Sequence, residues 1–141
     1  MGTWPNQDRT SRISSCSIRA VIVRANESFN CVLAGIEDIE RDLKNPQFIG
    51  LKPYRTYSVT GDISQCRIHE FLPHEQMELA NEHSLWGTMH LSRFDGCADQ
   101  HNLDDLEEYT TKRYPNIRWQ LAHCARSFTY WPIHQAIDRL R

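Results

Sequence analysis

The sequence has no apolar run long enough to cross a membrane and no apolar segment near its start that could act as a signal peptide. It also lacks a strong excess of either charge, because 16 lysines and arginines face 18 aspartates and glutamates, for a net charge of −2. These absences give no reason to expect a membrane or a nucleic acid as a partner. We therefore expect a cytoplasmic protein.

Compact cysteine and histidine motifs are absent as well. The five cysteines form no CxxC pair, which argues against both a disulfide framework and a zinc knuckle and favours reduced thiols. No HxH pair occurs anywhere in the chain. A metal site, if there is one, has to be assembled from histidines that are far apart in the sequence.

What the sequence does contain is an alternation of short apolar runs with amphipathic stretches. It has 141 residues, of which 40% are hydrophobic, enough for one domain with a core. Strands alternating with helices indicate an α/β fold with a parallel sheet and right-handed crossovers. The strands are expected at residues 18–23, 48–52, 85–90 and 117–123, and the helices at 36–43, 73–84, 102–113 and 132–140.

Four such strand-helix units predict part of a (β/α)₈ barrel, since a whole barrel needs about 250 residues. We expect residues 1–17 to form an irregular lead-in and residues 18–141 to form an incomplete barrel domain, truncated at its C-terminus in the last helix. Four parallel strands leave two open edges with unpaired backbone groups. A homo-oligomer formed through these exposed strand edges is one expected partner.

Two histidines end apolar runs that are neighbouring strands in this prediction. His90 ends the strand at 85–90, and His123 ends the strand at 117–123. The carboxyl ends of parallel strands meet at one rim of the sheet, where α/β barrels build their active sites. Lys52 ends the preceding strand, so we expect Lys52, His90 and His123 to form a polar layer at that rim.

The alternation of side chains along a strand predicts which residues lie beneath this layer. The side chains expected on the same inward faces are Gly50, Thr88 and Leu121 and, one level deeper, Phe48, Trp86 and Trp119. A single strand-end histidine is more often a hydrogen-bonded structural residue than a ligand, and a lysine there is often only a solvated strand end. The other histidines fall in loops or on helices and are interpreted as surface residues: His69, His74, His83, His101 and His134.

Three short segments carry a family resemblance. Residues 50–53 (GLKP), 88–92 (TMHLS) and 121–126 (LAHCAR) resemble the middle strands of the amidohydrolase superfamily, in the expected order and spacing. The most similar branch is the amidohydrolase-related group, which includes metal-dependent lactonases and decarboxylases. The resemblance covers roughly residues 35–141 and implies a barrel with a divalent metal, expected to be zinc, at its carboxyl rim.

By position within that resemblance, His90 corresponds to the metal ligand on the fifth strand and His123 to the catalytic histidine on the sixth. Lys52 corresponds to the lysine on the fourth strand. Arg126 would lie just above the rim and, with Lys52, bind an anionic group of a small-molecule substrate. An ordinary loop ion pair is an equally good interpretation of Arg126.

The resemblance also shows what the sequence does not supply. A catalytic zinc site usually has three protein ligands and an open position for water, whereas only two histidines are provided here. The HxH pair of the first strand is absent, and no aspartate of an eighth strand follows the last helix. We therefore expect a chain that is inactive alone.

Three functional hypotheses remain at this point. The first is a fragment of a metal-dependent hydrolase, in which metal-activated water attacks an amide, ester or lactone carbon, or in which a related decarboxylation takes place. The second is a small open α/β module that binds a ligand or partner without catalysis. A third, weaker one is a thiol enzyme that uses Cys124 beside His123, but adjacent strand residues point to opposite faces.

Overall fold

A computed structural model describes residues 22–24, 35–126 and 130–140. The predicted lead-in at 1–17 and most of the strand predicted at 18–23 lie outside these residues. The strands are β1 (Ile22–Arg24), β2 (Phe48–Leu51), β3 (Trp86–Met89) and β4 (Arg118–Leu121). The helices are α1 (Ile36–Asp42), α2 (His74–Glu82), α3 (Gln100–Glu107), α4 (Ala122–Arg126) and α5 (Tyr130–Leu140), with short 3₁₀ turns η1 (Arg55–Tyr57), η2 (Ile68–Glu70) and η3 (Gly96–Ala98) and a π-helical turn η4 (Glu108–Arg113).

The described strands form one sheet in the order β1-β2-β3-β4. β2, β3 and β4 are parallel, which confirms the α/β class and a parallel sheet of three strands. β1 is antiparallel to β2, so the prediction of four parallel strands was wrong. A β-branched apolar run identifies a strand, but it carries no information on the direction in which that strand pairs.

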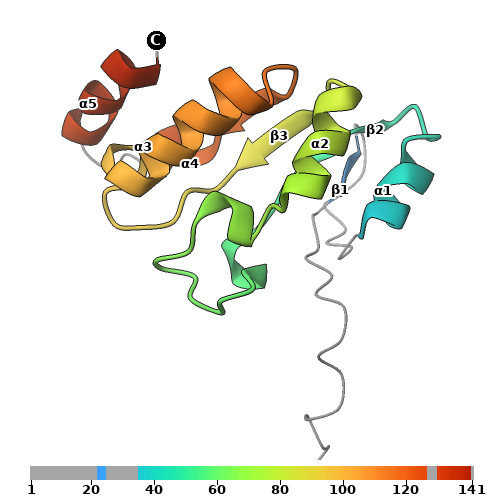
Figure 1. The fold of residues 1–141 in the computed structure, drawn as a ribbon, viewed down its shortest axis with the longest axis horizontal. Coiled ribbons are helices and arrows are strands. Elements are labelled where there is room, and N and C mark those ends of the chain that lie inside the picture. The colour runs from blue at the N-terminus through green and yellow to red at the C-terminus, as the bar shows by residue number, and fades with distance from the viewer. Residues whose placement is uncertain (1–21, 25–34, 127–129, 141) are drawn as a thin grey trace, which may run out of the picture.

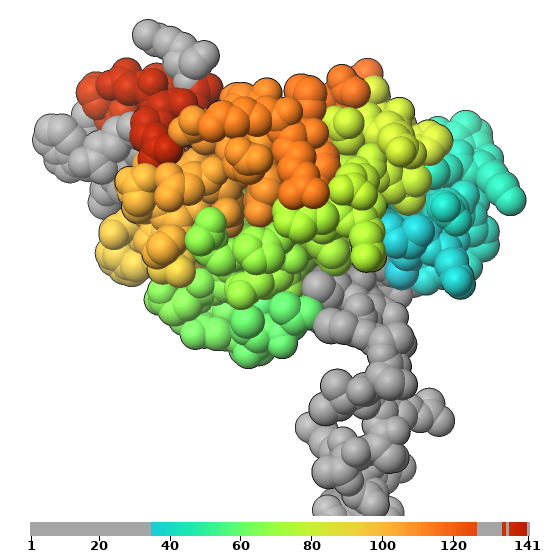
Figure 2. Space-filling view, in the orientation of Figure 1, coloured from blue at the N-terminus to red at the C-terminus, as the bar shows by residue number. Residues whose placement is uncertain are grey.

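Two helices, α1 and α3, begin where a carboxylate side chain accepts backbone N–H groups. The carboxylate of Asp38 accepts the N–H of Gly35 at 3.1 Å at the start of α1. Asp99 caps α3 by accepting the N–H groups of His101 and Asn102 at 2.9 and 3.3 Å. α1 and α5 lie at opposite ends of the molecule (Figure 1), and the segments between them follow one another largely in chain order across the face seen in Figure 2.

The core is formed between the sheet and the helices α2 and α3, which lie in front of it in Figure 1. The strands contribute Leu51 and Met89 to this core, and these residues are 1% and 0% exposed. The helices contribute the buried side chains Met77, Ala80, Leu103 and Leu106. Burial of such side chains is the main favourable term in folding. None of the helices among the described residues is both long enough and apolar enough to span a bilayer.

The prediction that Trp119 and Leu121 share a face with Trp86 and Thr88 was wrong, because the pairing of β4 is shifted by one residue. In the parallel register Trp86 pairs with Arg118 and Gly87 pairs with Trp119. A Cβ at Gly87 would lie 3.2 Å from the Trp119 ring, so Trp119 lies on the helix-covered side rather than with Trp86. The open side instead carries polar pairs: the Arg118 guanidinium lies 5.9 Å from the centroid of the Trp86 ring, and Thr88 donates to Gln120 at 3.1 Å.

The long connection from β2 to α2 is held against α3 by a partly buried ion pair. Arg67 donates to Asp105 from both Nε, at 2.9 Å, and Nη2, and the N–H of Ile68 donates to the same carboxylate at 3.1 Å. Asp105 is 3% exposed. Further along, the N–H of Arg93 donates to the carbonyl of Ser64 at 2.8 Å. These contacts fix residues 64–68 of the connection against α3 and the loop after β3.

Candidate functional site

The structure brings the rings of His90 and His123 together. β3 ends at Met89, so His90 is the next residue, and β4 ends at Leu121, so His123 lies two residues beyond it. The ring centroids are 5.1 Å apart and the ring planes are inclined by 54°. Two imidazoles therefore meet at the carboxyl ends of adjacent parallel strands, as the sequence predicted.

His123 reaches this position by a route that the sequence did not indicate. Four successive residues, from His123 to Arg126, have φ values of 54°, 50°, 56° and 59°, so α4 is a left-handed turn. L-residues pay about 1–2 kcal/mol each for this conformation. The predicted strand to His123 was therefore wrong in its last two residues. The left-handed turn brings His123 and Arg126, three residues apart, to the wall of one cavity.

A glycine makes room for this turn. Gly96 has a φ of +52°, and a Cβ there would lie 2.7 Å from the carbonyl oxygens of both Ala125 and Arg126. Any other residue would collide with the backbone of the turn. The backbone of η3 therefore packs directly against the backbone of α4. The strained backbone of α4 includes His123, one of the two histidines of the pair. Strained backbone is concentrated at functional sites in proteins.

Lys52 and Tyr54 extend the histidine pair into a stack. The Lys52 ammonium lies 5.3 Å from the centroid of the Tyr54 ring. The Tyr54 ring in turn lies 5.1 Å from the His90 ring, at an interplanar angle of 20°. Lys52 therefore lies at the predicted rim, but it reaches His90 through an aromatic ring that sequence reasoning did not single out.

Beside the histidines is a cavity of about 290 Å³. The described residues that line it are Arg55, His90, Leu91, Ala122, His123 and Arg126, and none of these is acidic. Arg126 donates to the carbonyl of Leu91 at 3.4 Å, and Arg55 donates to the carbonyl of Ile63 at 2.9 Å. Arg55 was missed at the sequence level, because it lies in a 3₁₀ turn whose position depends on the folding of the whole connection.

The charged side chains in the described lining of this cavity are both arginines. Burial, followed by the charges of Lys52, His123 and Arg55, lowers the pKa of His90 from its ordinary value of 6.5. Burial and the charge of Arg126 lower the pKa of Arg55. His90 is therefore neutral at pH 7, which leaves its ring one nitrogen lone pair for a proton or a metal.

The described part of the chain does not contain a full set of zinc ligands. Nε2 of His90 is buried and has no hydrogen-bond partner there, which suits a ligand atom. However, residues 22–24, 35–126 and 130–140 contain no group of three or more His, Cys, Asp or Glu side chains arranged to hold a metal ion. The residues at hand fit half of a catalytic zinc site, with cations rather than carboxylates around it.

A second histidine cluster lies away from this site. Nδ1 of His69 is 3.2 Å from the Tyr109 hydroxyl, and Nδ1 of His74 is 2.9 Å from the Tyr114 hydroxyl. The two imidazole rings stack with centroids 5.8 Å apart. Both histidines are half-buried, so interpreting them as simple surface residues was wrong, whereas the exposed positions expected for His83, His101 and His134 are confirmed. The tyrosines come from η4 and the residue after it, and no local sequence pattern indicates a π-helical turn there.

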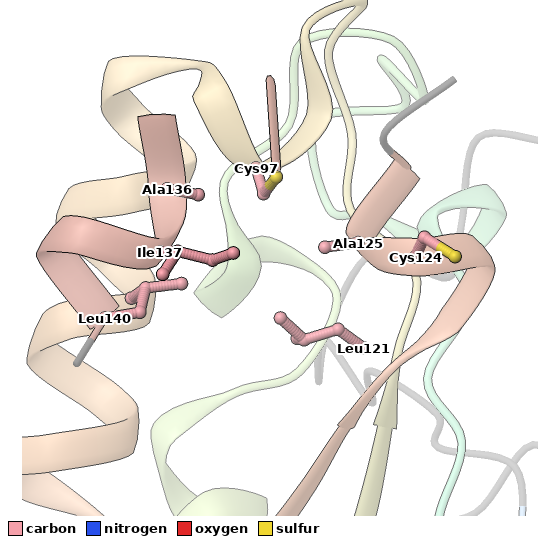
Figure 3. Close-up of a pocket in the computed structure, with 7 residues that line it drawn as sticks. All are labelled: Cys97, Leu121, Cys124, Ala125, Ala136, Ile137 and Leu140. Atoms are coloured by element: carbon pink, nitrogen blue, oxygen red, sulfur yellow. The ribbon is translucent and has the colours of Figure 1, made fainter. Parts of the chain in front are cut away.

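A larger cavity, of about 370 Å³, is apolar (Figure 3). Its described lining is Cys97, Leu121, Cys124, Ala125, Ala136, Ile137 and Leu140. In Figure 3, Ile137 and Leu140 of α5 face Leu121 across the cavity. Cys124 lines this apolar cavity, whereas its neighbour His123 lines the cavity that also contains Arg55 and Arg126. The two residues therefore line different cavities.

Comparisons of the chain with protein families, with curated proteins and with solved structures found no match.

Proposed function

We propose that this chain supplies the central strands of a metal-dependent hydrolase of the amidohydrolase type, arranged as part of a (β/α)₈ barrel. The observation that carries the proposal is the approach of His90 and His123 to 5.1 Å at the carboxyl ends of adjacent parallel strands. That end of a parallel barrel is where catalytic residues of such enzymes lie. The sequential strand order from β2 to β4 is also the order of a barrel.

In this proposal each residue of the site has a distinct role. His90 holds the metal through its buried Nε2, and His123 moves a proton to or from the reacting oxygen. Arg126 and Lys52 attract an anionic group of the substrate. Bound zinc would make hydroxide available at neutral pH for attack on an amide, ester or lactone carbon. The remaining metal ligands would come from outside the described residues, and we expect the chain to be inactive alone.

A second candidate function is a module that binds an anionic ligand without catalysis. It is favoured by one specific observation, namely that the described lining of the cavity contains two arginines and no acidic side chain. Cations beside a metal site oppose the binding of a metal cation by Coulomb repulsion. This candidate keeps the positions of all the site residues and removes only the metal.

Zinc binding by the full chain separates the two functions. Isothermal titration of the chelator-treated protein with Zn²⁺ should show one site that is lost in His90→Ala and kept in His123→Ala, because His90 is the ligand and His123 the proton-transfer group. The exposed His83→Ala variant is the matched control and should bind as the unmodified chain does. Zinc binding that survives His90→Ala, or no zinc binding at all, would reject the zinc site at His90 and favour the anion-binding module.

A further inference from the structure

The imidazole of His90 contacts two other aromatic rings. The Tyr54 ring stacks on it, with centroids 5.1 Å apart and planes inclined by 20°. The His123 ring approaches to the same distance at a steeper angle of 54°. Nε2 of His90 is buried and has no hydrogen-bond partner within the described residues. The groups that the described structure provides to orient this ring are therefore other rings.

These surroundings differ from those of most metal-binding histidines. One ring nitrogen of such a residue binds the metal, and the other usually donates to a carboxylate, a backbone carbonyl or water, which fixes the orientation of the ring. No carboxylate or carbonyl in the described part of the chain is hydrogen-bonded to the ring of His90. Another group has to replace that bond, and the face of the Tyr54 ring lies where it can do so.

The fold itself brings Tyr54 to this place. Tyr54 lies three residues beyond the end of β2, and His90 is the first residue beyond the end of β3, so the parallel pairing of these strands brings the two residues together. The carbonyl of Tyr54 accepts the N–H of Tyr57 at 3.0 Å, which ties its backbone into the start of η1. Pro53 precedes Tyr54 and has a restricted φ. The Tyr54 side chain is half-buried against this fixed backbone.

The contact between Tyr54 and His90 needs a ring rather than a hydroxyl group. Aromatic pairs are favoured in offset or tilted arrangements with centroids about 4.5–7 Å apart, and this pair lies within that range. A phenylalanine at position 54 would keep the flat face. A leucine would fill part of the same volume but would favour no particular plane for its neighbour.

We propose that Tyr54 is a positioning residue, whose stacked ring holds the imidazole of His90 in the orientation in which it meets His123. The inference deepens the proposed function, and its meaning for metal binding rests on that function. The orientation itself requires no metal, so it can be measured in the metal-free chain.

The first measurement is NMR of the full, chelator-treated chain with labelled histidine and tyrosine rings. We expect nuclear Overhauser contacts between the rings of Tyr54 and His90 and between those of His90 and His123. The contact between the histidines should persist in Tyr54→Phe and should be weaker in Tyr54→Leu than in either of the other two proteins. Tyr57→Leu is the matched control and should leave this contact unchanged, because Tyr57 lies in the same connection and is 36% exposed.

The second measurement is calorimetric titration of the same proteins with Zn²⁺. Loss of a group that orients a metal-binding histidine typically lowers metal affinity by about 10–100-fold. Tyr54→Leu should therefore weaken zinc binding by about tenfold or more, and Tyr54→Phe and Tyr57→Leu by less than about twofold. If the unmodified chain binds no zinc, the zinc site fails, and the NMR measurement still decides the role of Tyr54.

Three results would overturn the proposal: an unchanged contact between the histidines in Tyr54→Leu, equal losses in Tyr54→Leu and Tyr54→Phe, or zinc binding that Tyr54→Leu leaves as tight as before. If Tyr54→Leu does not fold, the unmodified chain and Tyr54→Phe decide. The proposal then stands where both show the contact between the histidines and the unmodified chain shows that between Tyr54 and His90. It falls where any of these contacts is missing.

Discussion

Gly96 packs directly against the backbone of Arg126, and a Cβ at position 96 would be 2.7 Å from the carbonyl oxygen of Arg126. Contacts this short do not occur in relaxed proteins, so the glycine determines where the turn α4 can lie. The positions of His123 and Arg126 depend on it, although Gly96 itself does not belong to the described lining of the cavity.

Replacing Gly96 with alanine should therefore damage both stability and the site. We expect Gly96→Ala to lower the free energy of unfolding by about 3 kcal/mol, as the sum of a left-handed alanine and an overpacked contact. Urea denaturation measures this loss. Gly61→Ala is the control, because Gly61 also has a positive φ (+71°) but open space around it. It should lose only about 1 kcal/mol, and equal losses in the two variants would show that the contact does not matter.

The buried side chain of Asn102 holds the loop after β3 by hydrogen bonds to two of its carbonyls. The side chain is 0% exposed, and Nδ2 donates to the carbonyls of Ser92 at 2.9 Å and Gly96 at 2.8 Å. Asn102→Ala removes two buried hydrogen bonds, although the carbonyl of Gly96 still accepts the N–H of Asp99 at 3.2 Å, and should lower the free energy of unfolding by about 2–3 kcal/mol. Asn45→Ala, which removes one exposed bond to the N–H of Gln47, should cost under about 1 kcal/mol in the same urea experiment. A loss for Asn102→Ala no larger than that of the control would contradict this role.

The stability of the protein should fall as the pH drops below 6.5. Burial, followed by nearby positive charges, lowers the pKa of both His74 and His90 from 6.5. Below pH 6.5 the unfolded chain takes up protons at these residues that the folded chain does not, so acid favours unfolding. Above pH 6.5 both states hold neutral imidazoles, and this pH dependence disappears.

Urea denaturation at pH 7.5 and pH 5.5 measures this effect. The free energy of unfolding should be lower at pH 5.5, and His74→Gln should reduce the difference between the two pH values. The exposed His83→Gln should leave the difference unchanged. A stability that rises toward pH 5.5 would show that the two rings gain rather than lose protons on folding.

The Tyr109 phenol should resist ionisation in the folded protein. Burial, followed by the charge of Asp105, raises its pKa from 10 to about 12. Between pH 10 and 12 the unfolded chain gives up this proton while the folded chain keeps it, so stability falls as the pH rises through that range. An absorbance titration of phenolate should show a late-ionising phenol that Tyr109→Phe removes and exposed Tyr57→Phe retains. Loss of the late phenol in Tyr57→Phe instead would reject the assignment.

The part of the fold that depends on local periodicity could be predicted from the sequence. The three parallel strands β2, β3 and β4 and helices at the expected places follow from apolar runs and helical spacing. The direction of β1 depends on how it pairs, and the face of Trp119 depends on register. A shift of one residue moves a side chain to the other side of a sheet, and no local pattern fixes it here.

The candidate site was predictable in part for the same reason. His90 and His123 were expected at one rim because parallel strands end together, and their rings do lie side by side. Arg55 and Tyr54 could not be found this way, because their positions depend on distant contacts such as the Arg67 and Asp105 ion pair. The left-handed turn could not be predicted either, because glycine is the residue that usually marks positive φ values and none of these four residues is a glycine.

A histidine-resolved NMR titration of the full chain with Zn²⁺ tests most directly whether His90 and His123 form one site. We predict that the imidazole resonances of these two residues shift together with a single dissociation constant, while those of His83, His101 and His134 stay in place. Different constants for His90 and His123, or shifts confined to the exposed histidines, would contradict a shared site.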